Sequence, residues 1–99
     1  MQAVTFSAFG GPEVLDVTEL ADPRPASGGV VVLVAASTIN PTDLMMRRGE
    51  QAALMTHLAP PYIAGMEFSG TVDSVAPGVS IPVGQRVIGV VNPRRPGGG

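Results

Sequence analysis

Three polar residues in the middle of the chain carry most of the chemistry that this sequence could perform. Asn40 and Asp43 stand in "INPTDLMMRRG", and Glu67 stands in "IAGMEFSG" among apolar or small neighbours. An asparagine amide can donate a hydrogen bond to an oxygen on which negative charge develops. A buried carboxylate needs several donors or an arginine, and Arg47 and Arg48 are the candidates, because an unpaired buried charge is costly. Together these residues indicate a polar site, provided that the fold gathers them.

Each of these residues also has a structural interpretation. Asn40 precedes Pro41 and stands three positions before Asp43, a pattern typical of a helix N-cap with a capping box. Alternation along residues 67–73 puts Glu67 on the polar, solvated face of a strand. Both interpretations stay open for Asn40 and Glu67, and for Asn40 they are compatible.

The other candidates give weaker signals. His57 is the only histidine, and one imidazole without a nearby base or nucleophile predicts neither a metal site nor a triad. Tyr62 follows two prolines and could line a cleft, although an aromatic anchor at a loop end is commoner. Arg94 and Arg95 could touch a phosphate, but their glycine- and proline-rich surroundings favour a solvated linker.

Short strands must carry these residues. Residues 3–7 and the run "VLDVTEL" are β-prone and flank "FGGP", so we predict a hairpin. The continuous β-branched run at 30–36 predicts a central strand that is buried on both faces. Two more strands are predicted in "EFSGTVDSVA" and "VGQRVIGVV".

One helix is expected. It begins after the Asn40 cap, has Pro41 in its first turn and ends near Gly49. Residues 50–62 show weak periodicity, and we predict a flexible excursion there that ends at the proline pair. We expect one domain over residues 1–91 and a Pro/Gly/Arg-rich tail over 92–99 in which nothing could pack.

The composition places the chain among globular domains with many short strands. Hydrophobic residues make up 44% of the 99 residues, and 13 glycines and 10 prolines punctuate them, which predicts a small barrel or sandwich. A net charge of −2 gives no field that would attract nucleic acid or an anionic membrane. The longest apolar run, "GVVVLVAA", is far shorter than the roughly 20 residues of a membrane span. With no cysteine and no signal-peptide pattern, we expect a cytoplasmic protein without thiolate metal sites.

Four motifs in order resemble a known family. The stretches "FGGPEVL", "INPTDLMMRRG", "PPYIAGMEFSGTVDSVAPGV" and "VGQRVIGV" are similar to the N-terminal, GroES-like domain of medium-chain dehydrogenases/reductases, in the zinc-independent quinone oxidoreductase branch. The resemblance runs from Met1 to about Val91. It implies a mainly β fold, a GroES-like small β-barrel with one or two short helices, which in the family precedes a Rossmann domain.

The resemblance implies an NADPH-dependent reductase that transfers hydride to a quinone, an enone or another activated alkene. Asn40 matches an asparagine at the nicotinamide end of the cleft, and we predict that it contacts both cofactor and substrate oxygen. Met45 and Tyr62 are predicted as substrate-side walls; Met45 stands where some relatives carry a tyrosine, and methionine cannot donate a proton. Asp43 and Glu67 are predicted to support the cleft.

The resemblance also bears on zinc and on partners. Zinc-dependent relatives have a cysteine ligand at the position of Asn40 and a histidine ligand at the position of Met66. Neither residue present is a good zinc ligand, so we expect no zinc. The expected partners are a Rossmann domain, in the same chain or a partner chain, and a second copy in a homodimer.

A second hypothesis comes from another class of function. Residues 1–99 contain no GxGxxG turn that opens a helix, which is the feature that holds a dinucleotide pyrophosphate. A stand-alone barrel that serves as a non-enzymatic binding module is therefore the alternative.

Overall fold

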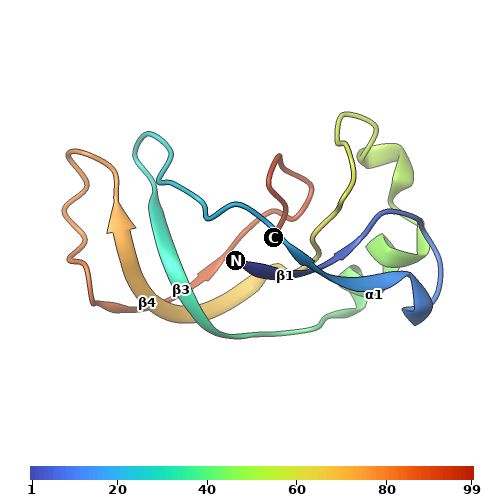
Figure 1. Ribbon diagram of the computed structural model, residues 1–99, viewed down its shortest axis with the longest axis horizontal. Helices are drawn as coiled ribbons and strands as arrows, with labels where there is room; N and C mark the ends of the chain where they lie inside the picture. The colour runs from blue at the N-terminus through green and yellow to red at the C-terminus, as the bar shows by residue number, and fades with distance from the viewer.

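The computed structural model describes all 99 residues and is built mainly of strands, as predicted (Figure 1). In chain order the elements are β1 (Gln2–Phe6), the 3-10 helix η1 (Pro12–Val14), β2 (Leu15–Glu19), β3 (Val30–Ser37), α1 (Pro41–Arg48), the 3-10 helix η2 (Ala52–Leu54), β4 (Glu67–Val75) and β5 (Arg86–Val90). No helix is long and apolar enough to cross a membrane.

The predicted hairpin is confirmed. Strands β1 and β2 pair antiparallel, with Val4 opposite Val17, and η1 forms the connection after the glycine pair. The hydroxyls of Thr5 and Thr18 share a hydrogen bond of 2.8 Å across the two strands. The backbone of Phe6 also exchanges two hydrogen bonds with Tyr62, which ties the excursion to β1.

The second sheet has the order β3-β4-β5, and all its pairs are antiparallel. The expectation of a central β3 is therefore wrong: β4 is central and β3 lies at an edge. Leu33 and Val34 of β3 are 69% and 55% exposed. A β-branched run predicts a strand, but what covers the strand depends on distant segments, and none of the described segments lies on those side chains.

A glycine on β4 permits the pairing with β3. A Cβ at Gly70 would collide with the backbone carbonyl of Leu33, and the β3–β4 register shifts nearby, between Val34 and Ala36. The strands therefore need a residue without a side chain at Gly70.

The helix α1 is confirmed with its predicted ends. Asn40 has an extended backbone at the N-cap, and Gly49 ends the helix in the left-handed region, with φ of 92°. The predicted flexible excursion is wrong in part, because residues 50–62 contain η2 and bury Gln51 and Met55.

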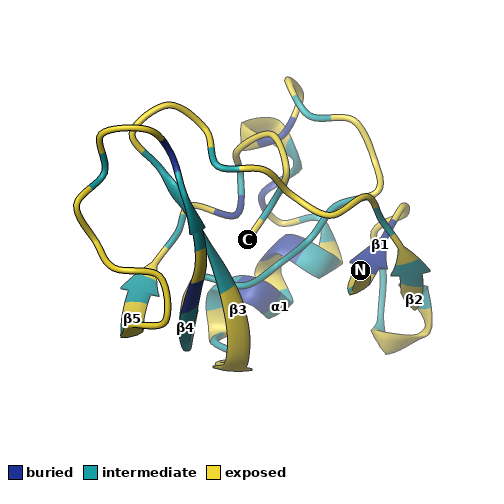
Figure 2. Ribbon diagram, turned by 60° about the vertical axis from the view of Figure 1, so that its left-hand side comes forward, coloured by how far each residue is buried: buried dark blue, intermediate teal, exposed yellow.

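The elements form two lobes along a long axis of 40 Å (Figure 1). We call β1, β2, α1 and η2 the core lobe, and β3, β4 and β5 the sheet lobe. The core lobe contains the hydrophobic cluster of Phe6, Met46 and Met55. Figure 2 shows buried residues in α1 and β1 and also in β4 and the loops, whereas β3 and β5 are exposed or half-buried. The site described below lies where the two lobes meet.

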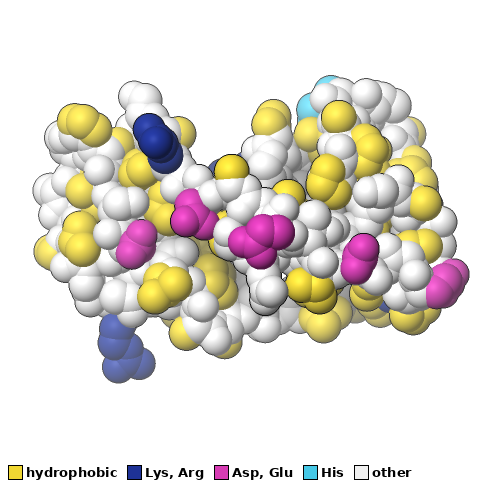
Figure 3. Space-filling model, viewed as in Figure 1, with side chains coloured by type: hydrophobic (Ala, Val, Ile, Leu, Met, Phe, Trp, Pro, Cys, Tyr) yellow, Lys and Arg dark blue, Asp and Glu magenta, His cyan; other side chains and the backbone are white.

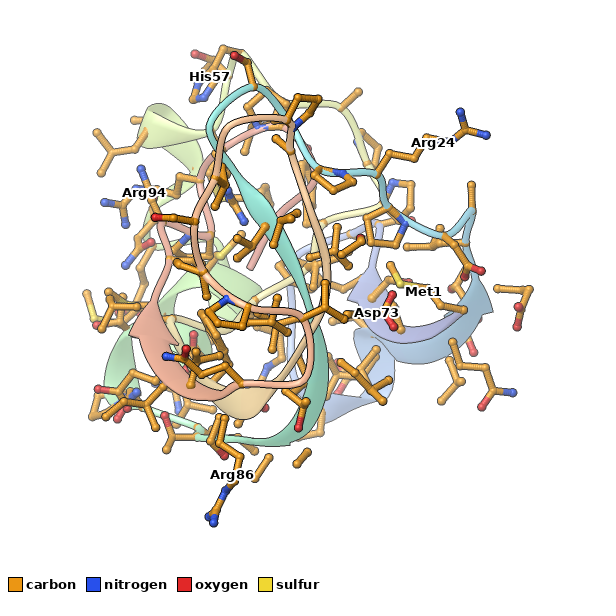
Figure 4. The ribbon with its side chains drawn as sticks, turned by 90° about the vertical axis from the view of Figure 1, so that its left-hand side faces the viewer. Met1, Arg24, His57, Asp73, Arg86 and Arg94 are labelled. Atoms are coloured by element: carbon orange, nitrogen blue, oxygen red, sulfur yellow. The ribbon has the colours of Figure 1, made fainter.

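The tail packs more closely than its composition suggests. Pro93 is fully buried, and Arg94 donates a hydrogen bond of 3.0 Å to the Gln51 side chain. His57 lies on the same side as Arg94 (Figure 4), where its Nε2 is 3.1 Å from the Arg94 carbonyl oxygen. The domain boundary at residue 91 stays a prediction.

Candidate functional site

Three segments bring the predicted polar residues together. They are the chain that leaves β3 at Thr38, the N-terminus of α1 at Asn40 and Asp43, and the first residue of β4, Glu67. Because β3 and β4 pair antiparallel, the end of β3 lies beside the start of β4, with Ser37 opposite Phe68. Strand pairing therefore places residues from positions 38 and 67 within hydrogen-bonding distance.

Asp43 joins the helix to the segment before β4. It is buried, and its Oδ2 accepts a hydrogen bond of 2.8 Å from the Asn40 backbone N–H, which belongs to the predicted capping box. Its Oδ1 accepts a bond of 3.0 Å from the Gly65 N–H. The φ of 121° at Gly65 strongly favours glycine. The predicted supporting role of Asp43 thus has a concrete form, because its carboxylate connects two chain segments.

Asn40, Thr38 and Glu67 form a triangle of hydrogen bonds. The Thr38 hydroxyl donates to Glu67 Oε2 at 2.6 Å. The Asn40 side-chain amide lies 3.1 Å from Thr38 Oγ1 and 3.4 Å from the same Glu67 oxygen. Asn40 is half-buried, while Thr38 and Glu67 are exposed. The side-chain amide of Asn40 therefore faces the polar cluster, while its backbone N–H makes the capping bond to Asp43.

Hydrogen bonds hold Glu67 in its charged form. The bond from Thr38, and to a smaller extent the bond from Asn40, lower the pKa of the Glu67 carboxyl from its ordinary value of 4.5. The expectation that a buried Glu67 would need an arginine does not apply, because the residue is exposed and has these two donors. Arg47 instead donates to the Gly10 carbonyl at 3.2 Å, which fastens α1 to the hairpin.

Thr38 is the member of this cluster that sequence reasoning missed. It stands two positions before Asn40 in an extended segment, and side chains two apart in such a segment share a face. This spacing is the signal that could have identified Thr38 as a neighbour of the Asn40 side chain. It could not have shown that Glu67 lies beside both residues, because Thr38 and Glu67 are 29 positions apart in the sequence.

A groove of about 260 Å³ lies next to the cluster. Most of its wall is apolar, and the polar side chains of Thr38, Asp43 and Arg47 also border it. Its other lining residues are Val4, Phe6, Leu15, Ser37, Ile39, Leu44, Ala64 and Gly65. An apolar groove with a few polar groups at its edge suits a small, largely apolar ligand that carries one or two oxygen atoms.

The two predicted substrate walls do not line this groove. Met45 is 40% exposed, and the core position on α1 belongs to its neighbour Met46. The Tyr62 ring stacks on Phe9 with centroids 5.7 Å apart, and it borders a separate hollow of about 240 Å³ that His57 also lines. Contact of Met45 or Tyr62 with a substrate stays a prediction.

The titratable side chains do not gather into a metal centre. No group of three or more His, Cys, Asp or Glu side chains comes together anywhere in residues 1–99. The labelled arginines Arg24, Arg86 and Arg94 extend from separate parts of the molecule in Figure 4. That zinc plays no part stays a prediction that depends on the residue types at Asn40 and Met66.

The described residues do not fit the phosphates of a dinucleotide. A dinucleotide cradle needs a glycine-rich turn from a strand into a helix. The connection from β3 to α1 is "TIN", followed by a proline, and every strand pair is antiparallel. Contact of the Asn40 amide with a cofactor stays a prediction.

Comparisons with known proteins agree with this fold. The chain matches the alcohol dehydrogenase GroES-like domain family over residues 26–97. It is 36% identical over 81 residues to a quinone oxidoreductase of Rattus norvegicus, covering 81% of this chain and 24% of that protein. The structure is similar to a quinone oxidoreductase from Coxiella burnetii, with a TM-score of 0.84 and 29% identity, covering 91% of this chain and 29% of the other.

A further solved structure concerns the cofactor. The Escherichia coli quinone oxidoreductase complexed with NADPH has a TM-score of 0.77 and 34% identity, covering 89% of this chain and 26% of the other. The chain thus spans about a quarter of the length of these relatives. The comparisons concern the part of each relative that these residues match.

Proposed function

The chain belongs to the alcohol dehydrogenase GroES-like domain family, within the medium-chain dehydrogenase/reductase superfamily, and we propose that it serves an NADPH-dependent oxidoreductase. The proposed reaction is the transfer of hydride to a quinone, an enone or another activated alkene. The similarity to quinone oxidoreductases supports the reaction class, and the NADPH complex of the Escherichia coli protein supports the cofactor.

The observation that carries this proposal is an apolar groove bordered by Thr38, whose hydroxyl oxygen accepts a hydrogen bond from the Asn40 amide. When hydride adds to the electrophilic carbon of an enone or quinone, an electron pair moves onto the carbonyl oxygen. A donor placed at that oxygen stabilises the developing charge. Asn40 offers such a donor, and the groove beside the cluster is largely apolar, as the ring of a quinone requires. The oxygen then takes a proton from solvent, which completes the two-electron reduction.

Several parts of the proposal depend on groups outside the described fold. NADPH supplies the hydride, and its phosphates are held by a Rossmann domain in the same chain or in a partner chain. Asn40 contributes one contact at the nicotinamide end, with Met45 and Tyr62 on the substrate side and Asp43 and Glu67 as support. We further propose that the enzyme uses no zinc, acts in the cytoplasm as a homodimer, and has its catalytic domain boundary near residue 91.

A pair of asparagine variants tests the proposal. The protein is assayed for NADPH oxidation with 1,4-benzoquinone, followed by absorbance. Replacing Asn40→Ala removes the donor and is expected to lower kcat by about 100-fold. The matched control is Asn92→Ala, because Asn92 also precedes a proline, is exposed, and has a side chain that accepts a hydrogen bond only from the Arg94 backbone N–H. That variant is expected to keep wild-type activity.

Two results would contradict the proposal in different ways. Equal activity of the Asn40→Ala and wild-type proteins would remove Asn40 from the reaction. No NADPH oxidation by any form, together with no quenching of NADPH fluorescence on mixing, would favour the alternative of a non-enzymatic binding module.

A further inference from the structure

The three distances in the cluster limit how the two N–H bonds of the Asn40 amide can meet their partners. Thr38 Oγ1 and Glu67 Oε2 are 2.6 Å apart, and Asn40 Nδ2 lies 3.1 Å from the first and 3.4 Å from the second. The side between the two oxygens is the shortest of the triangle, so the angle at Nδ2 is the smallest. That angle is less than half of the roughly 120° between the two N–H bonds of a planar amide.

One N–H that points between the two oxygens makes the less bent pair of hydrogen bonds, because two separate N–H groups would each have to bend further from their oxygen. One N–H of Asn40 is shared between Thr38 and Glu67, and the second N–H points elsewhere. No protein group accepts this second hydrogen, and Asn40 is half-buried rather than enclosed. The second N–H is therefore free to meet a ligand.

The chemistry of the partners excludes the flipped amide. An ionised carboxylate only accepts hydrogen bonds, so the group of Asn40 that faces Glu67 must be the NH2 and not the carbonyl oxygen. The Thr38 hydroxyl has one hydrogen and gives it to Glu67 at 2.6 Å, so Thr38 can only accept from Asn40. Thr38 and Glu67 therefore each require that the NH2 group of Asn40, and not its carbonyl oxygen, faces them.

We propose that Thr38 is a positioning residue, which together with Glu67 holds one N–H of Asn40 and so directs the other N–H at the ligand oxygen. Without the hydroxyl, the amide would rotate about its side-chain bonds and point the donor at the ligand for only part of the time. Thr38 borders the groove, but its hydroxyl hydrogen is given to Glu67, so Thr38 acts on the ligand oxygen through Asn40. The effect on a reaction depends on the proposed function, whereas the orientation of the amide does not.

The test compares Thr38→Val, which keeps the shape of the side chain and removes the hydroxyl, with Thr38→Ser, which keeps the hydroxyl. The protein is labelled with ¹⁵N at asparagine side chains, and the two N–H signals of Asn40 are followed with their hydrogen-exchange rates. In wild type we expect one slow and one fast hydrogen. In Thr38→Val both should exchange fast, and in Thr38→Ser the difference should return.

Activity is measured on the same samples. Thr38→Val is expected to lower kcat by about tenfold to 100-fold with a smaller change in KM, and Thr38→Ser to restore it. Thr56→Val is the matched control, because Thr56 is exposed and has no side-chain hydrogen bond in the structure. Since Thr38 is also exposed, we expect all three variants to fold.

The two readouts separate failure of this inference from failure of the proposed function. Unchanged Asn40 signals in Thr38→Val, or a Thr38→Ser variant that behaves like Thr38→Val, would overturn the inference whatever the activity. Altered signals in a protein that never oxidises NADPH would support the positioning role and contradict the proposed reaction. Altered Asn40 signals in a Thr38→Val protein with wild-type turnover would also overturn the inference, because the direction of the second N–H would then not affect the reaction.

Discussion

The core lobe and the sheet lobe hold their apolar residues in different ways. In the core lobe Phe6, Met46 and Met55 are each at most 2% exposed and form one cluster, which joins β1, α1 and the residue after η2. In the sheet lobe Val72 is buried, but Ile88 and Val90 on the neighbouring strand are 86% and 71% exposed. Figure 3 shows hydrophobic side chains open to solvent over the sheet lobe.

The difference explains where a rigid site can form. Backbone pairing is present in both lobes, whereas the cluster of three buried apolar residues lies in the core lobe. The polar cluster takes Thr38 and Glu67 from strand ends of the sheet lobe, and Asn40 and Asp43 from the helix of the core lobe. Functional groups are placed most precisely on rigid elements, and here Asp43 connects the helix of the core lobe to the segment that leads into β4.

The largest change in the free energy of unfolding should come from a substitution in the core lobe. Phe6→Ala would leave a cavity beside Met46 and remove the ring contacts with Phe9 and Tyr62. We expect a loss of about 3–5 kcal/mol in the free energy of unfolding, measured by urea denaturation. A loss below about 1 kcal/mol would mean that this cluster does not hold the fold.

The next effect concerns the connection between the lobes. Asp43→Ala would leave the backbone N–H groups of Asn40 and Gly65 without their acceptor, which should cost about 1–3 kcal/mol. Amide hydrogen exchange should speed up at Gly65. Asp73→Ala is the control, because Asp73 is exposed, lies in the sheet lobe and makes no hydrogen bond through its side chain. Equal stability of the two variants would argue against the connection.

A change of pH should alter the free energy of unfolding by a smaller amount, through Glu67. The bonds from Thr38 and Asn40 favour the charged carboxylate and lower the pKa of Glu67 below 4.5. Their stabilisation is complete above that ordinary value, and it is lost as the pH falls through the lowered pKa of the folded protein. Denaturation at pH 7 and at pH 3 should show this loss in wild type and in Glu50→Gln, an exposed control, but less of it in Glu67→Gln. The same loss in all three proteins would exclude Glu67 as its source.

The smallest effect should come from the open face of the sheet lobe. Val90→Thr at a 71% exposed position should change the free energy of unfolding by no more than about 0.5 kcal/mol. Val72→Thr introduces the same hydroxyl at a 1% exposed position and should cost about 1–3 kcal/mol. If Val90→Thr costs as much as Val72→Thr, then another surface covers this face in solution.

Local patterns are enough to predict much of the fold and part of the site. The hairpin, the helix from Asn40 to Gly49 and the strand that begins at Glu67 follow from turn residues, caps and alternation, all of which act over a few positions. The capping box between Asn40 and Asp43 is of the same kind. The order of the four motifs likewise indicates the family, because it is a property of the chain and not of its packing.

Features that depend on distant segments could not be predicted in this way. The β-branched run of β3 determines that it is a strand, but its place at an edge depends on the pairing of β4 with both neighbours. The choice of Met46 over Met45 for the core depends on where Phe6 and Met55 lie.

The sequence by itself determined which groups are available: a donor amide at Asn40, a carboxylate at Glu67, a hydroxyl at Thr38, and no cysteine. Only the tertiary structure decided that the hydroxyl and the carboxylate lie within hydrogen-bonding distance of the same amide nitrogen. The reason is that residue type sets what a side chain can donate or accept, whereas the direction of a hydrogen bond depends on three segments that strand pairing and helix packing bring together.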